Sequence, residues 1–240
     1  MRLAVCILHY GKEDLTARLH RQFLDADPGE AGNVFVLDNA SPEAYPHAWT
    51  RLPENRFWGG AFAWALDAFG AMGYTHLWFC NNDVVFVSNP PYISRAKTRM
   101  RRLEKQGGAG LYSPSATSNP YHRQMACRQD AECRKAMYID GIAPIVALEC
   151  VKDVGGLDLG ENPYGYGVDV WLSYRAAKAG WGVWVDHALV LRHKYHAAAR
   201  EQTGFMAVAA KAEKAYMTKR LGPAWRETLA AMQTTQEVMP

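Results

Sequence analysis

The stretch Thr75–Val87, THLWFCNNDVVFV, decides how the rest of the chain can be arranged. Its first half, His76–Cys80, is mostly apolar and aromatic, which is typical of a strand buried on both faces of a sheet. Three polar residues, Asn81, Asn82 and Asp83, follow before apolar residues return. Ligands of open α/β sheets bind at the carboxyl ends of strands, so this segment is predicted to edge a binding site. On these residues alone a tight turn between two strands is an equally good interpretation.

The N-terminal part of the chain predicts a strand, a helix and a second strand, over Leu3–Leu8, Asp14–Leu24 and Val34–Leu37. Two short apolar runs separated by a segment of helical spacing are typical of a βαβ unit with a right-handed crossover. The residues that follow the two strands are His9, Tyr10, Gly11, Asp38 and Asn39. We expect these residues at the same edge of the sheet as the central segment.

A pair of glycines, Gly59 and Gly60, stands just before the predicted helix Ala61–Met72. Backbone amides at a helix N-terminus can approach an anion closely where no side chain intervenes. Arg56 stands beside the pair, and a guanidinium is a preferred partner of phosphate. The alternative is a loop followed by a helix that needs close packing.

The rest of the chain predicts further helices and strands of an α/β domain. In order they are a basic helix at Ile93–Gln106, a strand at Gly107–Tyr112, a polar irregular loop at Ser113–Cys133, an apolar strand segment at Met137–Cys150 interrupted at Asp140–Gly141, helices at Val151–Leu159 and Asp169–Gly180, and a strand at Trp181–Val185 that continues towards His193. Residues from Ala199 to Met232 are mostly helical and amphipathic. We therefore expect one domain over residues 1–198, with residues 199–240 as its C-terminal helical extension.

Composition narrows the classes of function. The formal net charge of +3 speaks against nucleic acid as a partner. The basic helix Ile93–Gln106 fits a solvated face better than an anionic partner or membrane surface, although the latter stays open. No apolar run approaches the roughly 18 residues of a transmembrane helix, and no signal peptide is apparent. A cytoplasmic location, with peripheral contact to the inner face of the membrane as an option, is the expectation.

Six segments, taken in order, resemble the inverting family-2 glycosyltransferases of the GT-A fold, and in particular the bacterial rhamnosyltransferase-like branch. They are CILHYGKEDL, VLDNAS, ENRFWGGAFAWAL, LWFCNNDVVF, YIDGIAPIVALECVKDVGGLD and YGVDVWLSYRAAKAGWGVWVDHALVLRH. The resemblance covers about residues 3–195. It implies a mostly parallel Rossmann-like sheet flanked by helices, and the transfer of a sugar from a nucleotide-diphosphate donor to an acceptor hydroxyl.

The resemblance also implies roles for individual residues. Asp169 would be the general base of an inverting single displacement, and Asp83 and His193 would hold Mn²⁺ or Mg²⁺. Donor-binding positions would be His9, Tyr10, Gly11, Asp38, Asn39, Arg56, Gly59, Gly60, Asn81 and Asn82. Acceptor-side positions would be Asp140, Gly141, Tyr166 and Trp171. The donor would be UDP-, dTDP- or GDP-linked and the acceptor a glycan or a lipid-linked glycan, as in polysaccharide biosynthesis.

The chain departs from the family pattern at several positions. Val168 stands where the family has a glutamate next to the base, Trp171 where it has another acid, and Phe62 where it has an asparagine. Asn81 offers a neutral amide at the position of a second metal contact. Two alternatives stay open: a GT-A module that binds nucleotide or glycan without turnover, which Asn81 and Val168 would favour, and a transferase that glycosylates nucleic acid, which the basic helix would favour.

Overall fold

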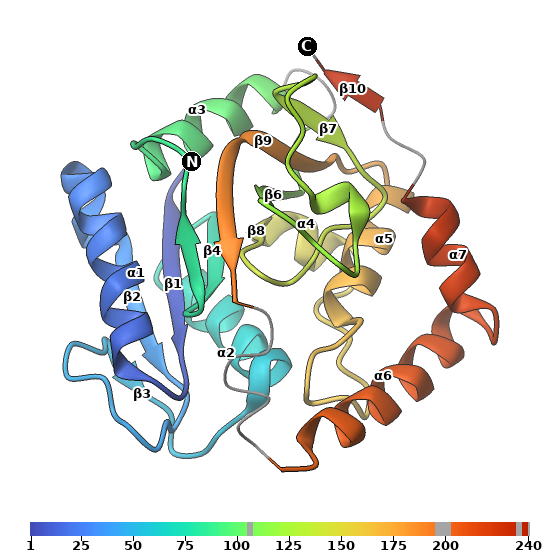
Figure 1. The fold of residues 1–240 in the computed structure, drawn as a ribbon, viewed down its shortest axis with the longest axis horizontal. Coiled ribbons are helices and arrows are strands. Elements are labelled where there is room, and N and C mark those ends of the chain that lie inside the picture. Colours follow the sequence, from blue (N-terminus) through green and yellow to red (C-terminus); the bar gives the residue numbers. More distant parts are fainter. Residues whose placement is uncertain (105–107, 195–202, 234–236, 240) are drawn as a thin grey trace.

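The computed structural model describes residues 1–104, 108–194 and 203–233 and the backbone of residues 237–239. Within them, one ten-stranded sheet is flanked by helices (Figure 1). Its strands are β1 Leu3–His9, β2 Val34–Asp38, β3 Thr50–Arg51, β4 His76–Asn81, β5 Val84–Phe86, β6 Leu111–Ala116, β7 Cys133–Lys135, β8 Ile145–Ala147, β9 Val183–His193 and β10 Glu237–Met239. The helices are α1 Glu13–Ala26, α2 Phe57–Ala71, α3 Ile93–Glu104, α4 Leu148–Asp153, α5 Val168–Lys178, α6 Phe205–Leu221 and α7 Trp225–Met232, with 3-10 turns at Pro28–Asn33 and Arg123–Met125.

The sheet is mixed, with parallel pairing where the sequence predicts the βαβ unit. Its strand order is β10-β7-β9-β6-β8-β4-β1-β2-β3, and β5 pairs with β9 off this path. The strand β1 is parallel to both β2 and β4, β2 is parallel to β3, and β6 is parallel to β9. The pairings of β8, β7, β10 and β5 are antiparallel and join two or three residue pairs each. The expected parallel sheet therefore describes the β3-β2-β1-β4 half of the molecule.

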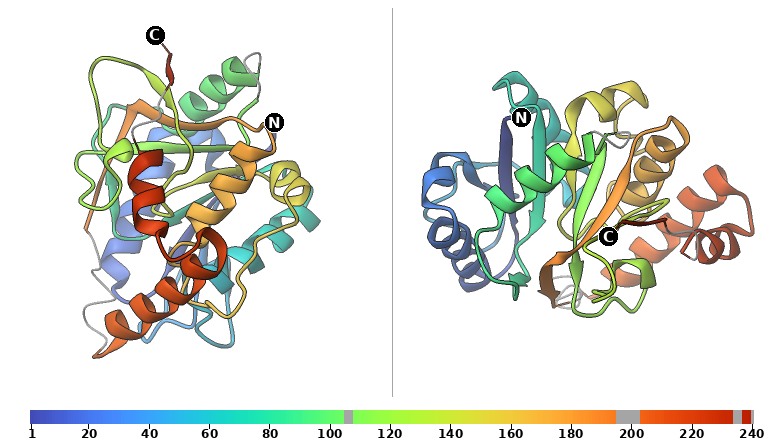
Figure 2. Two further views of the ribbon diagram at one scale, coloured as in Figure 1. Left: turned by 90° about the vertical axis from the view of Figure 1, so that its right-hand side faces the viewer. Right: turned by 90° about the horizontal axis from the view of Figure 1, so that it is seen from above.

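The two faces of β1 enter two different hydrophobic cores, as expected for a strand that reads as one apolar run. Leu3, Val5 and Ile7 pack in one core and Ala4, Cys6 and Leu8 in the other. The first core draws on α1 and α3, and the second on α2, α4 and α5. Helices thus cover both faces of the sheet, which is visible when the molecule is seen from above (Figure 2).

A third apolar cluster attaches residues 203–233, called here the C-terminal arm, to the sheet domain. Its members are Tyr138, Val168, Val170, Tyr216, Met217, Trp225 and Leu229. Arg220 adds an ion pair with Asp158, 2.6 Å long, to the turn after α4. The arm therefore lies along the N-terminal end of α5, and α6 and α7 form the lower right border of the molecule in Figure 1.

Several element boundaries differ from the sequence-based expectations. The strand expected at Gly107–Tyr112 is β6, which extends to Ala116 and so into the segment expected to be irregular. The apolar segment ending at Cys150 holds only a short strand, and helix α4 begins at Leu148. The strands β7 and β10 were not expected. Residues 105–107 and 199–202, which belong to two predicted helices and one predicted strand, lie outside the described residues.

The basic helix α3 uses its charges within the molecule. Lys97 pairs with Glu30 at 2.5 Å, Arg99 pairs with Glu132, and Arg95 donates a hydrogen bond to a backbone carbonyl in the middle of β9. Its apolar face is buried against the sheet. This arrangement agrees with the interpretation of α3 as a structural helix with a solvated face.

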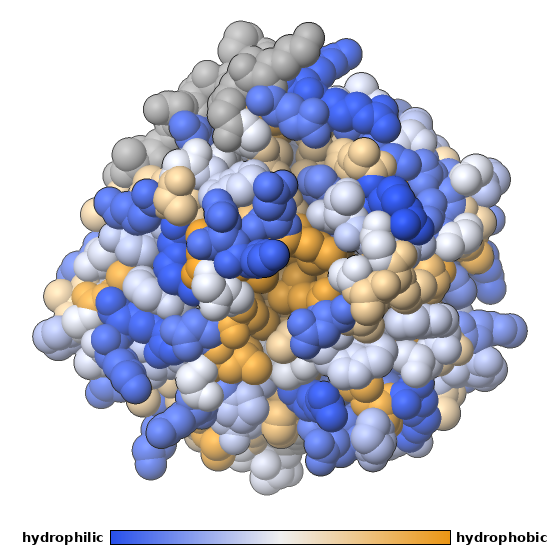
Figure 3. All heavy atoms as spheres, turned by 180° about the vertical axis from the view of Figure 1, so that it is seen from behind, coloured by the Kyte–Doolittle hydropathy of each residue, from blue (hydrophilic) through white to orange (hydrophobic). Residues whose placement is uncertain are grey.

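The surface is largely hydrophilic, with a few apolar exceptions. Seen from behind, apolar residues gather in a hollow near the middle of that face, with hydrophilic residues around it (Figure 3). Large exposed apolar side chains include Val87, Tyr121 and Val208. None of the helices in the described ranges combines the length and the apolar character that a membrane crossing requires.

Candidate functional site

The two residues that the resemblance implies as metal ligands, Asp83 and His193, meet at the end of β4. They are 110 positions apart, but β5 runs antiparallel to β9 with Val84 opposite His193. This register places Nε2 of His193 2.9 Å from Oδ1 of Asp83. The side chains of His193 and Asp83 are 8% and 11% exposed, so the pair is largely buried.

The pair borders a cavity of about 710 Å³, within the usual range for small-molecule sites. Ten residues singled out from the sequence line it: Tyr10, Asn39, Asn81, Asn82, Asp83, Asp140, Gly141, Tyr166, Asp169 and His193. They come from the carboxyl ends of β1, β2, β4 and β9, from the loop before β8, and from the turn before α5 and its first residues. The cavity therefore lies at the sheet edge where α/β proteins bind ligands.

Asp169 lies in the first turn of α5, where a carboxylate is favourable to the helix dipole. It also faces the cavity, and the backbone amide of Gly141 donates a hydrogen bond of 2.5 Å to its Oδ2. A Cβ atom at Gly141 would lie 3.0 Å from this oxygen, so a glycine permits the close approach. Burial, together with the nearby carboxylate of Asp140, raises the pKa of Asp169 to about 8.

Asn39 shapes the rim of the cavity through hydrogen bonds to the turn before α2. Its Nδ2 donates to Oδ1 of Asn55 at 2.9 Å, and its Oδ1 accepts from the amide of Arg56 at 2.9 Å. The turn ends at Phe57, whose φ of +52° is costly for an aromatic residue. Phe57 lines the cavity and lies edge-on to Tyr164, with ring centroids 4.8 Å apart. Asn39 thus fixes a strained aromatic residue at the site.

Three residues expected to contact the donor lie outside the cavity lining. His9 is buried, with its ring nitrogens 2.7 Å from the hydroxyl of Thr16 and 2.6 Å from a backbone carbonyl oxygen. Asp38 accepts hydrogen bonds from two downstream backbone amides and pairs with Arg51 at 2.6 Å. The amide of Gly11 donates to a serine hydroxyl at 3.0 Å. These three residues therefore stabilise the loops that follow β1 and β2, and they do not line the cavity.

Four more predicted positions also lie away from the cavity lining. A Cβ atom at Gly59 would lie 2.9 Å from Cδ2 of Leu159, and one at Gly60 would lie 3.0 Å from Cβ of Arg56. The glycine pair therefore permits close packing at the start of α2, the alternative that the sequence left open, and Arg56 immediately precedes this helix. The indole of Trp171 donates to a carboxylate in the turn after α4.

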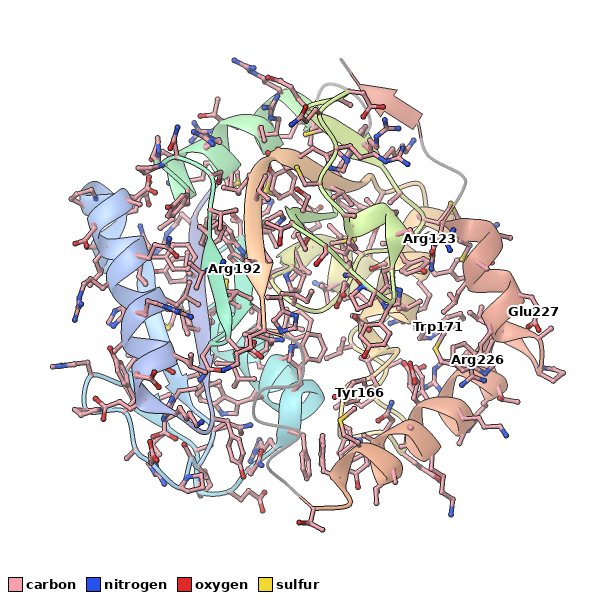
Figure 4. All side chains as sticks on the ribbon, in the orientation of Figure 1. Arg123, Tyr166, Trp171, Arg192, Arg226 and Glu227 are labelled. Atoms are coloured by element: carbon pink, nitrogen blue, oxygen red, sulfur yellow. The ribbon has the colours of Figure 1, made fainter. Side chains whose placement is uncertain are left out.

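The sequence-based reasoning did not place the C-terminal arm at the site. The arm contributes Phe205, Met206, Ala209, Ala210, Glu213, Met217, Trp225, Arg226, Leu229, Ala230 and Gln233 to the cavity wall. The available signal was the spacing on α6, where positions 206, 209, 210, 213 and 217 fall on one helical face. In Figure 4, Arg226 lies at the start of α7 and Tyr166 lies between α2 and α6.

The cavity is rich in acids. Its described lining includes the carboxylates of Asp83, Asp140, Asp169 and Glu213, and Arg226 as the single guanidinium or ammonium group. A diphosphate brought to this cavity would need a further cation. The side chains of Asp83 and His193 offer a carboxylate oxygen and an imidazole nitrogen side by side, a donor set that suits Mn²⁺ or Mg²⁺.

Within the described ranges, no group of three or more His, Cys, Asp or Glu side chains forms a complete metal site. A cation held between one carboxylate, one imidazole and the oxygens of a phosphate ligand needs no such group, since Mg²⁺ commonly takes few protein ligands beside substrate phosphates. The residues present therefore fit a metal that is shared with a phosphate-bearing ligand.

No protein-family model matches the chain. Among curated proteins it is 27% identical over 178 residues to "Uncharacterized protein Rv1525" of Mycobacterium tuberculosis and to "Uncharacterized protein Mb1552" of Mycobacterium bovis. The match takes in 68% of this chain and 64% of each relative, so it spans less than two thirds of those proteins.

Three solved structures resemble the fold. GalNAc-T7 with UDP, GalNAc and Mn²⁺ has a TM-score of 0.57 at 12% identity. The match covers 80% of this chain and 44% of the GalNAc-T7 chain. The mannosyltransferase PcManGT from Pyrobaculum calidifontis, with GDP-Man and Mn²⁺, has a TM-score of 0.53 at 14% identity. The match covers 96% of this chain and 74% of the PcManGT chain. Glucosyl-3-phosphoglycerate synthase from Mycobacterium tuberculosis, with Mg²⁺ and UDP, has a TM-score of 0.58 at 13% identity. The match covers 92% of this chain and 79% of the synthase chain. At such identities the likeness concerns the fold, and on this basis the chain has the α/β GT-A fold of these glycosyltransferases.

Proposed function

We propose that the chain is an inverting glycosyltransferase that moves a sugar from a nucleotide-diphosphate donor to an acceptor hydroxyl. One observation carries the proposal: in a chain of GT-A fold, Asp83 and His193 meet at 2.9 Å beside the cavity that Asp169 also faces. The solved structures of similar fold bind UDP or GDP-Man together with Mn²⁺ or Mg²⁺. That evidence supports a UDP-, dTDP- or GDP-linked donor here.

Asp83 and His193 would hold the divalent cation. When bound, the cation stabilises the negative charge that develops on the diphosphate leaving group. The described lining holds four carboxylates and a single guanidinium, so the side chains alone leave a diphosphate poorly neutralised. This imbalance supports a requirement for metal, with Tyr10 and Asn81 as the neighbouring contacts for the donor.

Asp169 would act as the general base. Its carboxylate removes the proton of the acceptor hydroxyl while the hydroxyl oxygen forms a bond to the anomeric carbon and the bond to the diphosphate oxygen breaks. A pKa near 8 suits this role, since a general base works best when its pKa is close to the working pH. Gly141 holds the carboxylate in place through its amide, and Asp140 and Tyr166 border the acceptor side.

The finer assignments extend the same proposal. The acceptor is a glycan or a lipid-linked glycan, and the chain belongs to the rhamnosyltransferase-like branch of polysaccharide biosynthesis. A cytoplasmic location, with contact to the inner face of the membrane, would bring such an enzyme to a lipid-linked acceptor. The support for these assignments is the order of the six sequence segments described above.

Calorimetric titration tests the proposal. UDP, dTDP and GDP are each titrated into the protein with Mn²⁺ and then with EDTA, using the wild type, Asp83→Ala and the exposed control Asp67→Ala. We expect one nucleotide to bind tightly, and binding to be lost with EDTA and in Asp83→Ala while Asp67→Ala behaves as the wild type.

The outcomes separate the candidate functions. Failure of all three nucleotides to bind would overturn the proposal. Binding of a nucleotide without hydrolysis or transfer of the corresponding sugar would favour the alternative of a GT-A module that binds without turnover.

A further inference from the structure

The position next to Asp169 holds no acid, and the fold explains why. Val168 is 1% exposed and belongs to the cluster that contains Met217 and Trp225 of the C-terminal arm. A carboxylate at this position would be buried among apolar side chains without a partner, which is energetically costly. Docking of the arm therefore excludes an acid at position 168.

The same arm brings a different carboxylate into the cavity. Glu213 is half-buried and lies on the face of α6 that also carries Met206, Ala210 and Met217. Within the described part of the chain, its carboxylate makes no hydrogen bond and no ion pair within 4.0 Å, although the guanidinium of Arg226 is near enough to oppose the rise in its pKa that burial causes. Its charge nevertheless reaches the base, because Glu213 contributes to the raised pKa values of Asp169 and Tyr166.

We propose that Glu213 binds hydroxyl groups of the acceptor, and that this acceptor is an uncharged sugar bearing an apolar group. The inference rests on the proposed function and adds the substrate class. Ionised carboxylates accept strong hydrogen bonds from hydroxyl groups, and sugar hydroxyls are well suited to them. In this chain the arm would supply the acceptor-binding acid that position 168 lacks.

The character of the wall supports the choice of acceptor. Around Glu213 the arm presents Met206, Ala209, Met217 and Leu229 to the cavity. A long apolar group on the acceptor would pack against these side chains. Asp140 lies at the same cavity, and its carboxylate would repel a phosphate or carboxylate on the acceptor, as would Asp169 once it is ionised near its pKa of about 8. Arg226, the one cation of the described lining, is exposed.

Glu227 provides a matched control. It is an exposed acid on the same arm, it is not part of the described cavity lining, and it lies on the outer side of α7 in Figure 4. The experiment compares wild type, Glu213→Gln and Glu227→Gln, each saturated with Mn²⁺ and with the nucleotide that binds. Octyl glycosides of glucose, galactose and mannose, below their critical micelle concentrations, are titrated as probes, beside the methyl glycosides and the sugar 6-phosphates.

We expect at least one octyl glycoside to bind, and to bind more tightly than its methyl counterpart and the corresponding sugar phosphate. Glu213→Gln should weaken its binding about 10-fold or more, the effect of losing a hydrogen bond to a charged group. Nucleotide affinity should stay at the wild-type value in both variants, and Glu227→Gln should bind the glycoside as the wild type does.

Three results would overturn the inference while leaving glycosyl transfer in place, provided that nucleotide binding is intact. They are the absence of binding by every octyl glycoside, wild-type glycoside affinity in Glu213→Gln, and preferential binding of a sugar phosphate. A protein that binds no nucleotide would instead remove the proposed function, and this inference with it.

Discussion

At the scale of single residues, the role of Asp169 gives the most direct prediction. Asparagine keeps an oxygen that can accept the hydrogen bond from Gly141 but cannot take up a proton. Asp169→Asn should therefore lower turnover by about 10²- to 10⁴-fold, the usual contribution of a positioned general base. Nucleotide affinity measured by calorimetry should not change. Asp67→Asn, at an exposed site on α2, is the control, and a fully active Asp169→Asn would exclude the base assignment.

The pKa of Asp169 makes a second prediction. Because burial and Asp140 raise this pKa to about 8, the carboxyl stays protonated, and inactive as a base, below that pH. Turnover should rise about 10-fold per pH unit below this pKa, reach half of its maximum near pH 8 and level off above about pH 9. Asp140→Asn removes a neighbouring negative charge and should move the midpoint to lower pH. A turnover rate that is independent of pH in this range would contradict the prediction.

The sequence predicted some residue positions better than others, and the reason is physical. Asp83 and His193 could be predicted to lie together because each belongs to one of six segments that follow the order of the family pattern. The functions of His9 and Asp38 depend on Thr16 and Arg51, partners that only the folded chain brings to them. The helical spacing places Glu213 on one face of α6 with apolar residues, but nothing in the sequence shows that this face borders the cavity.

At the scale of elements, the packing of α2 against the turn before α5 gives a third prediction. Gly59→Ala would place Cβ 2.9 Å from Leu159 and 3.1 Å from the carbonyl oxygen of Pro163. This overpacking should cost about 1–3 kcal/mol of unfolding free energy in chemical denaturation. Gly29→Ala, where the added Cβ meets no heavy atom within 4 Å, should leave stability nearly unchanged. Equal stability of the two variants would show that the turn before α5 can move to accommodate the added methyl group at no cost, and would contradict the prediction.

Elements with strong local patterns were predicted, and those that depend on pairing were not. The apolar run of β1 and the helical spacing of α1 are sufficient to predict these two elements from the sequence. By contrast, β7 reads Cys-Arg-Lys, and only its antiparallel pairing with β9 makes it a strand. Strand character was expected to continue up to Cys150 because a short apolar run does not distinguish a strand from a buried helix.

At the scale of the whole molecule, the attachment of the C-terminal arm gives a fourth prediction. Trp225 is 5% exposed in the cluster that joins the arm to α5. Trp225→Ala should lower the unfolding free energy by about 3–5 kcal/mol, as for other large buried aromatic residues. Val208→Ala, at a side chain that is 51% exposed, is the control.

The shape of the thermal unfolding curve tests the same attachment. Because the arm shares an apolar cluster with α5, we expect arm and sheet to unfold in one cooperative transition. Two separate transitions in the wild-type protein would show that the arm is an independent unit.

The cavity is closed by residues from both ends of this sequence, from Tyr10 beside β1 to Gln233 after α7. Protein synthesis proceeds from the N-terminus, so the sheet edge with Asp83 leaves the ribosome long before the arm does. Until α6 and α7 arrive, the growing chain exposes Val168 and Tyr138, which the arm later buries. The wall that would recognise the proposed acceptor is thus added to the cavity after the sheet edge that would hold the proposed nucleotide.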